Sequence, residues 1–450
     1  MKGFWLDLNR CTGCHACRLA CTIENDLGAG RSWREVYTFN LQRRPGVPRF
    51  HLSLGCQHCA DPACMRACPA QAYSTDPVTG AVLVDEGLCI GCRYCNWACP
   101  FDSPRYSRPA GTMSKCTLCN GRLLEGKDPA CAALCPTGAL QFGELEPETG
   151  IARVPGFPVT RLKPSIRFMP LRPPGSGPEL SAPQEQPHAA GASRSMDLAV
   201  PRKMTMKSEW ALVMFTMMAG LLVAICGAAV VGALQVDPLA FVVAAVGALA
   251  VSAIHLGRVE RALRAVLNLR HSWLSRETVS YSAFVILSAM YFLMPLGGNS
   301  LGWAAFLSGL LTLFCIDRVY GAISARDAGW FHSAGSVFTG MFLTGILTGS
   351  TEVAGAFGLL KLVLYADRQS WFKNGARLAA SILRLGLGFV APLALWQAYP
   401  DWVLPAVLAG ELIDRCEYYL DMEIMTPRRR IATDLASAAG LLPPGSGGRP

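Results

Sequence analysis

The chain has 450 residues, of which 51% are hydrophobic and only 16% are charged, and its formal net charge is +9. Average soluble domains carry about 25% charged residues, so this composition indicates a membrane protein. Arginines gather in short loops between apolar segments, which is typical of membrane topology, and we find no basic patch rich in aromatic residues. We therefore expect a lipid bilayer as a partner and no nucleic acid.

Cysteines and apolar segments divide the chain into two unlike halves. Sixteen of the 19 cysteines lie before residue 136, and the long apolar runs begin after residue 208. The N-terminus leads to Cys11 without an apolar stretch long enough for a signal peptide, so dense cysteines predict metal or cluster ligands rather than disulfides. The predicted domains are a ferredoxin-like domain over 1–145, a Pro-rich linker over 146–208, a membrane domain over 209–425 and a tail over 426–450.

Four groups of four cysteines occupy the first domain. In each group the first two cysteines are three positions apart and the last two are four positions apart. Closely spaced thiolates on a tight loop fit three corners of a 4Fe–4S cubane, and in two-cluster ferredoxins the last cysteine binds the other cluster. Pro69, Pro100 and Pro136 follow three of the groups, as in that motif, whereas Thr22 follows the first. The groups are Cys11, Cys14, Cys17 and Cys21; Cys56, Cys59, Cys64 and Cys68; Cys89, Cys92, Cys95 and Cys99; and Cys116, Cys119, Cys131 and Cys135.

Tetrahedral zinc is the alternative occupant, because pairs of cysteines at this spacing also suit zinc. Zinc sites rarely need three thiolates within seven residues plus a fourth, so we expect iron–sulfur clusters. His15 and His58 lie inside the loops and are expected to be surface or supporting residues rather than ligands. Turn residues at 76–80 separate two strand-forming stretches, 73–75 and 81–84, which predicts a hairpin.

The second half of the chain is predicted to be a helical membrane bundle. A bilayer core about 30 Å thick needs about 20 apolar residues per helix. The sixth predicted span is short and contains Lys361, so it is the weakest. The fold class is thus an α+β ferredoxin-like iron–sulfur domain followed by an all-α polytopic membrane bundle of about eight transmembrane helices. The predicted spans are 210–234, 238–257, 279–298, 302–320, 329–349, 351–366, 379–399 and 402–420.

Residues 1–145 resemble the four-cluster iron–sulfur subunit of the dimethyl sulfoxide reductase family of molybdenum enzymes. The resemblance rests on the group spacings, on Lys115 before Cys116-x2-Cys119, and on Pro136-Thr-Gly-Ala-Leu140. In that family the first group pairs with the fourth and the second with the third, and a complete set of cysteines implies four 4Fe–4S clusters. The implied ligand sets are Cys11, Cys14, Cys17 and Cys135; Cys116, Cys119, Cys131 and Cys21; Cys56, Cys59, Cys64 and Cys99; and Cys89, Cys92, Cys95 and Cys68.

Residues 209–420 resemble the eight-helix anchor subunit of the same family, which oxidises or reduces quinone without haem. The matching stretches are His255-Leu-Gly257, Ser272 to Glu277, and Gly410 to Arg415 with Tyr418. Fusion of both parts in one chain departs from the separate subunits of the family.

Ionisable residues in membrane segments are costly and mark function by default. His255 ends the second span and Glu277 begins the third, so we expect both near one membrane face, where they bind menaquinone or ubiquinone and pass protons. A hydrogen-bonded pair that joins the two helices is the structural alternative. A haem between His255 and His332 is the alternative cofactor. Internal ion pairs of structural character are expected for Arg384, Glu411, Asp414 and Arg415.

Positive charge in the short loops predicts the orientation. Five arginines lie between the second and third spans, whereas the opposite loops 235–237 and 297–300 have no Lys or Arg. Excess Lys and Arg mark the cytoplasmic side. We therefore expect a multi-pass protein of the bacterial inner membrane with its iron–sulfur domain in the cytoplasm. Family members that oxidise sulfite in the cytoplasm fit this charge pattern better than exported dimethyl sulfoxide reductases.

Together these features predict an electron-transfer and membrane-anchor subunit that is not complete as an enzyme. It would relay electrons between the quinone pool and a large catalytic subunit that alone holds molybdopterin. That partner would oxidise sulfite or reduce dimethyl sulfoxide, other S-oxides or N-oxides. One alternative is a stand-alone hub between soluble ferredoxins and quinone. The other is an ion-translocating redox module that uses Lys361, Arg384 and Glu411 as a charged pathway.

Overall fold

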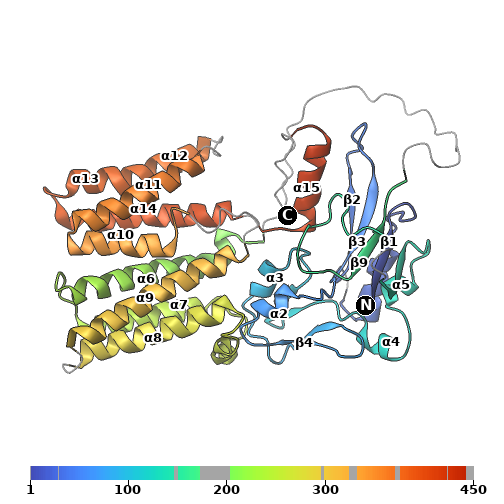
Figure 1. The fold of residues 1–450 in the computed structure, drawn as a ribbon, viewed down its shortest axis with the longest axis horizontal. Helices are drawn as coiled ribbons and strands as arrows, with labels where there is room; N and C mark the ends of the chain where they lie inside the picture. Colours follow the sequence, from blue (N-terminus) through green and yellow to red (C-terminus); the bar gives the residue numbers. More distant parts are fainter. Residues whose placement is uncertain are drawn as a thin grey trace.

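The computed structural model describes residues 2–28, 30–145, 150–172, 203–294, 298–323, 332–369, 375–422 and 424–441. Most of the predicted linker (173–202), the end of the tail (442–450), the start of the fifth predicted span and part of the loop 297–300 lie outside these ranges. In Figure 1 the described helices α6 to α14 lie side by side as a bundle, and the strands and short helices of the N-terminal domain lie at one end of it.

The N-terminal domain is built from short strand pairs that carry the cysteine loops between them. Strand β1 (Lys2–Asp7) lies in the centre of a three-stranded sheet, antiparallel to β8 (Leu140–Glu144) and parallel to β9 (Ile166–Met169). The predicted hairpin is confirmed, since β4 (Tyr73–Thr75) pairs antiparallel with β5 (Val82–Val84). The other hairpins pair β2 (Glu35–Phe39) with β3 (Phe50–Leu54), and β6 (Arg105–Ser107) with β7 (Thr112–Ser114).

Five short helices of this domain each overlap a cysteine group. Each is only four to nine residues long, so it places its cysteines close to the loop that precedes it. Four of them carry cysteines themselves, including Cys17 and Cys21 on the first. The helices are α1 (Ala16–Glu24), α2 (Ala63–Ala67), α3 (Tyr94–Ala98), α4 (Asn120–Leu124) and α5 (Ala130–Ala133).

Part of the range expected as linker is ordered on this domain. Strand β9 pairs with β1, and its Phe168 is fully buried beside Phe157. The C-terminal helix α15 (Pro427–Ala438) likewise packs against β2, and Asp434 accepts a hydrogen bond from the backbone N–H of Gly156 at 2.7 Å. Residues 150–172 and 427–438 therefore pack with the N-terminal domain.

The second half is mostly helical. Among the described residues, three segments are long and apolar enough to cross a membrane: Met206–Val230, Gly298–Gly321 and Arg377–Leu395. Pro238–Ala253 and Ser336–Thr348 are apolar but shorter. The helices are α6 (Met206–Val230), α7 (Pro238–Ala253), α8 (Trp273–Leu293), α9 (Gly298–Gly321), α10 (Ser336–Thr348), α11 (Thr351–Gln369), α12 (Gly375–Leu385), α13 (Ala391–Leu395) and α14 (Pro400–Asp421), with a 3-10 turn η1 (Val259–Val266) before α8 and a π-helical turn η3 (Gly386–Val390) between α12 and α13.

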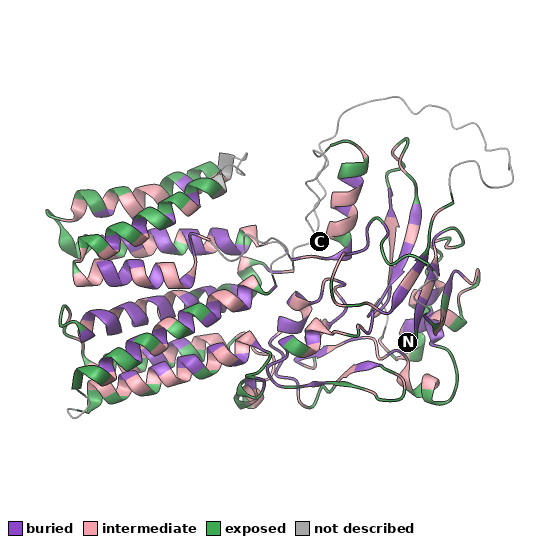
Figure 2. Cartoon of the chain, viewed as in Figure 1, coloured by how far each residue is buried: buried purple, intermediate pink, exposed green. Residues whose placement is uncertain are grey.

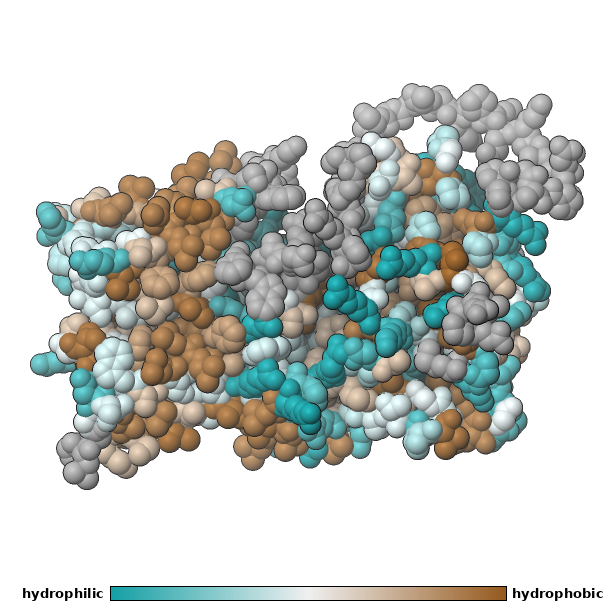
Figure 3. Space-filling view, viewed as in Figure 1, coloured by the Kyte–Doolittle hydropathy of each residue, from teal (hydrophilic) through white to brown (hydrophobic). Residues whose placement is uncertain are grey.

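Apolar side chains cover the outside of the bundle as well as its inside. Buried residues lie along the helix faces that meet in the bundle (Figure 2). The visible face of the bundle is largely hydrophobic, whereas hydrophilic side chains gather over the N-terminal domain (Figure 3). Large side chains such as Val243, Leu307 and Leu359 are 60–63% exposed on three different helices. A helix that is hydrophobic on all sides is typical of a membrane span.

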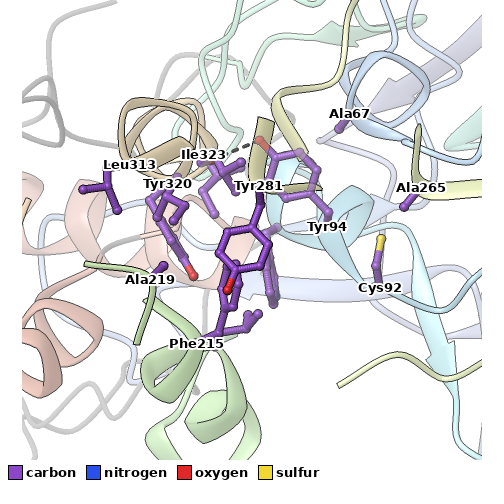
Figure 4. Close-up of a cluster of buried hydrophobic side chains, with 14 of the residues drawn as sticks. Ala67, Cys92, Tyr94, Phe215, Ala219, Ala265, Tyr281, Leu313, Tyr320 and Ile323 are labelled. Atoms are coloured by element: carbon purple, nitrogen blue, oxygen red, sulfur yellow. Dashed lines mark hydrogen bonds between the residues drawn. The ribbon is translucent and has the colours of Figure 1, made fainter. Parts of the chain in front are cut away.

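One hydrophobic core joins the two halves. It runs from Cys68, Cys92 and Tyr94 of the N-terminal domain to Phe215 and Tyr281 on α6 and α8. Figure 4 shows Tyr94, Tyr281 and Tyr320 in one buried cluster, with Cys92 at its edge. The second and third cysteine groups are thus packed directly on the helical bundle.

Candidate redox sites and their contact with the bundle

The cysteine loops turn through backbone conformations that glycine favours. Gly13 and Gly91 each lie between the first two cysteines of their group and have φ of 70° and 72°. His15 and Arg93 follow the second cysteine, also with positive φ, and helices α1 and α3 begin at the next residue. A side chain at Gly91 would overlap the carbonyl oxygen of Gly111, so this position requires glycine for space as well as for backbone freedom.

Two cavities are each lined by four cysteines from two groups. One lies between the first and the fourth groups, and the other lies between the second and the third groups. The first is lined by Cys11, Cys14, Cys17 and Cys135. The second is lined by Cys56, Cys59, Cys64 and Cys99. The structure therefore brings together the members of two of the four implied ligand sets.

The remaining cysteines are close enough to interact electrostatically in two further sets. Cys131 interacts with Cys119 and Cys21, and Cys116 interacts with Cys21 and Cys131. The other set combines cysteines of the second and third groups in the same way. There Cys92 interacts with Cys68 and Cys89, and Cys95 with Cys92 and Cys68. Each set again combines three cysteines of one group with the last cysteine of another.

Interactions between sets place them in a row. Cys17 of the first set interacts with Cys131 of the second, and Cys116 of the second interacts with Cys56 of the third. Cys64 of the third set interacts in turn with Cys95 of the fourth. The numbering of sets follows this row: the first contains Cys11, Cys14, Cys17 and Cys135; the second Cys21, Cys116, Cys119 and Cys131; the third Cys56, Cys59, Cys64 and Cys99; and the fourth Cys68, Cys89, Cys92 and Cys95.

The surroundings of the sulfurs fit iron–sulfur ligation. Backbone N–H groups point at ligand sulfurs, with Ala72 N 3.3 Å from Cys68 Sγ and Leu118 N 3.4 Å from Cys116 Sγ. Hydrogen bonds of this kind tune cluster potentials. Burial raises the pKa of the Cys131 thiol to about 11 and that of the Cys92 thiol to about 12, so cluster binding would release protons. Within the described ranges, no group of His, Cys, Asp or Glu converges on a single metal ion; a cubane makes no such demand, because its four cysteines bind different irons.

Comparison with known proteins agrees with this geometry. A family model described as a 4Fe-4S dicluster domain matches residues 48–145. The probable anaerobic dimethyl sulfoxide reductase chain YnfG of Escherichia coli is 45% identical over 152 residues, which cover 32% of this chain and 74% of that protein. This protein is a member of the iron–sulfur subunits of the dimethyl sulfoxide reductase family.

Relatives in this family differ in the substrates that their names state. A formate dehydrogenase-O iron–sulfur subunit of Escherichia coli is 36% identical over 157 residues, covering 31% of this chain and 52% of its own. A sulfite dehydrogenase subunit of Allochromatium vinosum is 34% identical over 196 residues, covering 37% and 82% respectively. These similarities cover about a third of this iron–sulfur subunit, and the family model ends at residue 145, before the helical bundle.

The segment between α7 and α8 holds the fourth cysteine set of this iron–sulfur subunit. Asn268 donates hydrogen bonds to the carbonyl oxygens of Cys68 at 2.8 Å and Arg66 at 3.2 Å. Arg261 donates to the carbonyl oxygens of Glu86 at 2.7 Å and Cys89 at 3.1 Å. Both cysteine groups that form the set are therefore fixed to the same segment of the bundle.

Close backbone contact reinforces this attachment. The backbone N–H of Arg258 donates to the carbonyl oxygen of Ile90 at 3.1 Å, and its side-chain Nε donates to Ala110 O at 2.8 Å. A Cβ atom at Gly257 would overlap the carbonyl oxygen of Gly111 and lie 2.6 Å from Tyr106 Oη. Only glycine allows the two halves to approach this closely.

The structure places the two predicted quinone residues beside different partners. His255 follows α7, where its Nδ1 meets the carbonyl oxygen of Ser252 and its own carbonyl accepts a bond from Arg93 at 3.3 Å. Glu277 is the fifth residue of α8, is 8% exposed, and interacts electrostatically with Arg415. His255 therefore lies close to the fourth set, because Arg93 follows Cys92 in the loop of that set.

Tyr94 connects Glu277 to this set. It is the first residue of α3, between Cys92 and Cys95, and it interacts electrostatically with both Glu277 and Cys92. Its hydroxyl donates to the carbonyl oxygen of Val319 at 3.0 Å. A buried carboxyl group and a tyrosine thus lie together between the fourth cysteine set and the bundle.

Sequence reasoning missed an aromatic cluster around Arg415. Its guanidinium lies 5.1–5.6 Å from the ring centres of Tyr320, Tyr418 and Tyr419, and it donates to Thr216 Oγ1 at 3.1 Å. Arg415, Tyr418 and Tyr419 are three and four positions apart on α14, which places them on one helix face. That spacing could have indicated the part of the cluster on α14. No sequence pattern indicates that Tyr320 on α9 joins it.

The internal ion pairs expected for α12 and α14 are present. Arg384 lies 2.8 Å from Glu411 and 3.3 Å from Asp414, and all three are almost fully buried. Lys361 from α11 completes the group, 2.8 Å from Glu411 and 3.9 Å from Asp414. Arg415 instead hydrogen bonds Thr216 and the carbonyl oxygen of Ala334. Two cations and two anions therefore balance one another inside the bundle.

Proposed function

We propose that this chain is the electron-transfer and membrane-anchor subunit of a quinone-linked molybdopterin oxidoreductase. The observation that carries the proposal is the row of four cysteine sets whose last member is hydrogen-bonded to the helical bundle. Membership of the iron–sulfur subunit family supports the redox role, and the apolar helices support the anchor role. The chain would therefore connect a soluble catalytic partner to the membrane.

Each cysteine set would hold one 4Fe–4S cluster. In this row the fourth set lies against the helical bundle, and the first set lies at the opposite end, farthest from the bundle. When bound, the clusters would supply one-electron carriers of tunable potential. The chain's own contribution is to hold the four sets in order, to exclude water from them, and to direct backbone N–H groups at their sulfurs.

The helical half would span the bacterial inner membrane about eight times, with the iron–sulfur domain in the cytoplasm. Exposed apolar side chains on α7, α9 and α11 support a lipid-facing surface. The Arg-rich segment between α7 and α8 contacts the iron–sulfur domain, so the side with excess positive charge is the side of that domain. Under the positive-inside rule this side is cytoplasmic.

A menaquinone or ubiquinone would bind where the fourth set meets the bundle, beside Glu277 and His255. Glu277 would accept or deliver a proton at its carboxyl group, and Arg415 lies within electrostatic range of it. Tyr94 would line the same place from the iron–sulfur side. The proximity of a buried carboxyl group to the fourth cysteine set supports this location.

The catalytic partner would bind at the opposite end of the row. Cys14 of the first set is exposed, and the neighbouring Leu19, Ile23 and Leu134 are 61–71% exposed. An exposed apolar patch of this kind marks a protein interface. The partner would be a large molybdopterin subunit that oxidises sulfite or reduces S-oxides or N-oxides. The names of two relatives state dimethyl sulfoxide and sulfite as substrates.

Purification from native membranes tests this assignment. A tagged chain would be isolated in mild detergent and analysed for iron, molybdenum and tungsten. We expect a large partner with about one molybdenum or tungsten atom per complex. A chain that purifies alone with full iron and no such metal would contradict the proposal and favour the stand-alone link between ferredoxins and quinone.

The buried charges of α11, α12 and α14 support a second candidate, an ion-translocating redox module. Lys361, Arg384, Glu411 and Asp414 form a charged group deep within the bundle. Proton uptake by proteoliposomes during quinone turnover distinguishes the two functions. Uptake beyond the protons of quinone chemistry favours translocation, and its loss in Lys361→Met would assign the pathway to this group.

A further inference from the structure

Two cations are buried among the cysteine sets without a carboxylate partner in the described part of the chain. Arg34 is 3% exposed and Lys115 is 1% exposed. Side chains of this kind are almost never buried unless they are paired, because the loss of hydration is costly. Lys115 also stands directly before the fourth cysteine group, in the stretch that marks the family resemblance. We therefore expect a negatively charged group close to each of these two side chains.

Arg34 lies between the first and second cysteine sets. Its Nη1 donates to the carbonyl oxygen of Ser53 at 3.0 Å, and the guanidinium lies 4.4 Å over the ring of Phe4. Its strongest electrostatic neighbours are four cysteines, namely Cys131, Cys17, Cys116 and Cys21. Cys17 Sγ is in turn 3.1 Å from the hydroxyl of Ser53. The guanidinium is thus held by neutral groups and faces ligands of two sets.

Lys115 occupies the corresponding place between the second and third sets. Its Nζ donates to the carbonyl oxygens of Val82 and Cys116, the latter at 2.8 Å. It interacts electrostatically with Cys64 of the third set and Cys116 of the second. It also lines the cavity of the third set. The ammonium group is therefore fixed by carbonyl oxygens, which are neutral and do not balance its positive charge.

A third lysine shows the contrast. Lys203 also donates to a carbonyl oxygen of a ligand, Cys99, at 2.8 Å. It pairs with Asp102 at 3.3 Å, however, so a carboxylate already balances its charge. Arg34 and Lys115 differ from Lys203 because neither forms an ion pair with a carboxylate in the described part of the chain.

We propose that Arg34 and Lys115 are shared counter-charges, each serving two neighbouring clusters and raising the potentials of both. The proposal rests on the assignment of clusters to the four sets. Thiolate ligands bring negative charge into a low-dielectric interior, and reduction adds one more electron. A fixed cation nearby stabilises the reduced form more than the oxidised form. The two cations would therefore keep the first three clusters reducible while they are shielded from water.

The test measures the midpoint potential of each cluster in the purified full-length chain by redox titration followed by EPR. Arg34→Gln is expected to lower the potentials of the first and second clusters, and Lys115→Gln those of the second and third. A tenfold drop in the equilibrium constant for reduction corresponds to about 59 mV for one electron. The second cluster, common to both, should shift most in the double variant, and the fourth should not shift.

Charge-conserving variants and a surface control separate charge from packing. Arg34→Lys and Lys115→Arg should restore most of the potential, and Lys127→Gln on the surface should change nothing. Where a Gln variant fails to retain iron, recovery of iron in its charge-conserving variant supports the same conclusion. Unchanged potentials in fully loaded Gln variants, equal shifts of all four clusters, or equal damage in both kinds of variant would overturn the inference. A wild-type chain without cluster signals would instead refute the proposed function.

Discussion

Asn268 donates its side-chain amide to the carbonyl oxygen of Cys68 at 2.8 Å, across 200 residues of sequence. The same amide reaches Arg66, and the neighbouring Ser272 donates to Ala67 at 2.9 Å. The α7–α8 segment therefore holds the backbone of a cysteine ligand and of the two residues before it. The fourth set consequently depends on the bundle for its shape, although every cysteine in it lies in the N-terminal domain.

This dependence predicts that Asn268→Ala weakens the fourth cluster selectively. The change leaves two carbonyl oxygens without a donor in a buried place, at a cost of about 1–3 kcal/mol each. We expect reduced iron content and a weaker EPR signal from one cluster, with the other three intact. Arg270→Ala, an exposed neighbour, is the matched control. Equal loss from all four clusters would mean that the domain as a whole, not this attachment, is damaged.

Cys99→Ser tests which cysteines share a cluster. Cys99 lines a cavity with Cys56, Cys59 and Cys64, although it is part of the third group by sequence. We therefore expect damage to the third cluster of the row, because serine is a poor substitute for a thiolate ligand. EPR of the variant compared with Cys95→Ser makes the distinction. Loss of the same cluster in both variants would contradict the ligand sets.

The N-terminal half could be predicted well because its ligands are local in sequence. Repeated cysteine spacings predicted an iron–sulfur domain of the dimethyl sulfoxide reductase family, and the comparisons confirm that family. The strand Ile166–Met169 could not be predicted, because four residues in a proline-rich stretch become a strand only by pairing with β1 about 160 residues away. The local sequence pattern does not indicate pairing between segments so far apart in the chain.

The candidate site in the bundle was predicted less completely for the same reason. Glu277 and His255 were chosen as ionisable residues at span ends, and both lie near the fourth cysteine set. Arg415 and its three tyrosines come from α9 and α14, so only tertiary packing brings them to Glu277. The donors Arg261 and Asn268 bind backbone carbonyls, a role that any polar residue could fill and that no sequence motif marks.

Glu277→Gln is expected to stop quinone turnover while sparing the clusters. The amide keeps the size of the side chain but cannot exchange a proton, so steps that need proton transfer should fall by about 10²–10⁴-fold. His255→Ala should act in the same direction. Quinone-linked and dye-linked activities of the purified complex are compared, with Glu260→Gln as an exposed control. Parallel loss of both activities would indicate that these residues are structural.

The orientation has a direct test in intact cells. If the positive side is cytoplasmic, protease added to spheroplasts should leave the iron–sulfur domain intact, because the membrane shields it. Detergent should then expose it to digestion. An antibody against a tag before residue 2 reports the outcome on a blot. Digestion without detergent would place the domain on the outer side and would reverse the predicted topology.

Gly257→Val should separate the two halves without unfolding either. A side chain at Gly257 would overlap the carbonyl oxygen of Gly111 and crowd Tyr106, and backbone atoms cannot rotate away as a flexible side chain can. We expect the Arg258 to Ile90 hydrogen bond to break and the fourth set to lose its support, so electrons would still enter from a dye but would no longer reach quinone. Gly247→Val on α7, where a side chain would meet nothing within 4 Å, is the matched control. Normal quinone turnover in Gly257→Val would show that the close approach of the two halves is not needed for electron transfer.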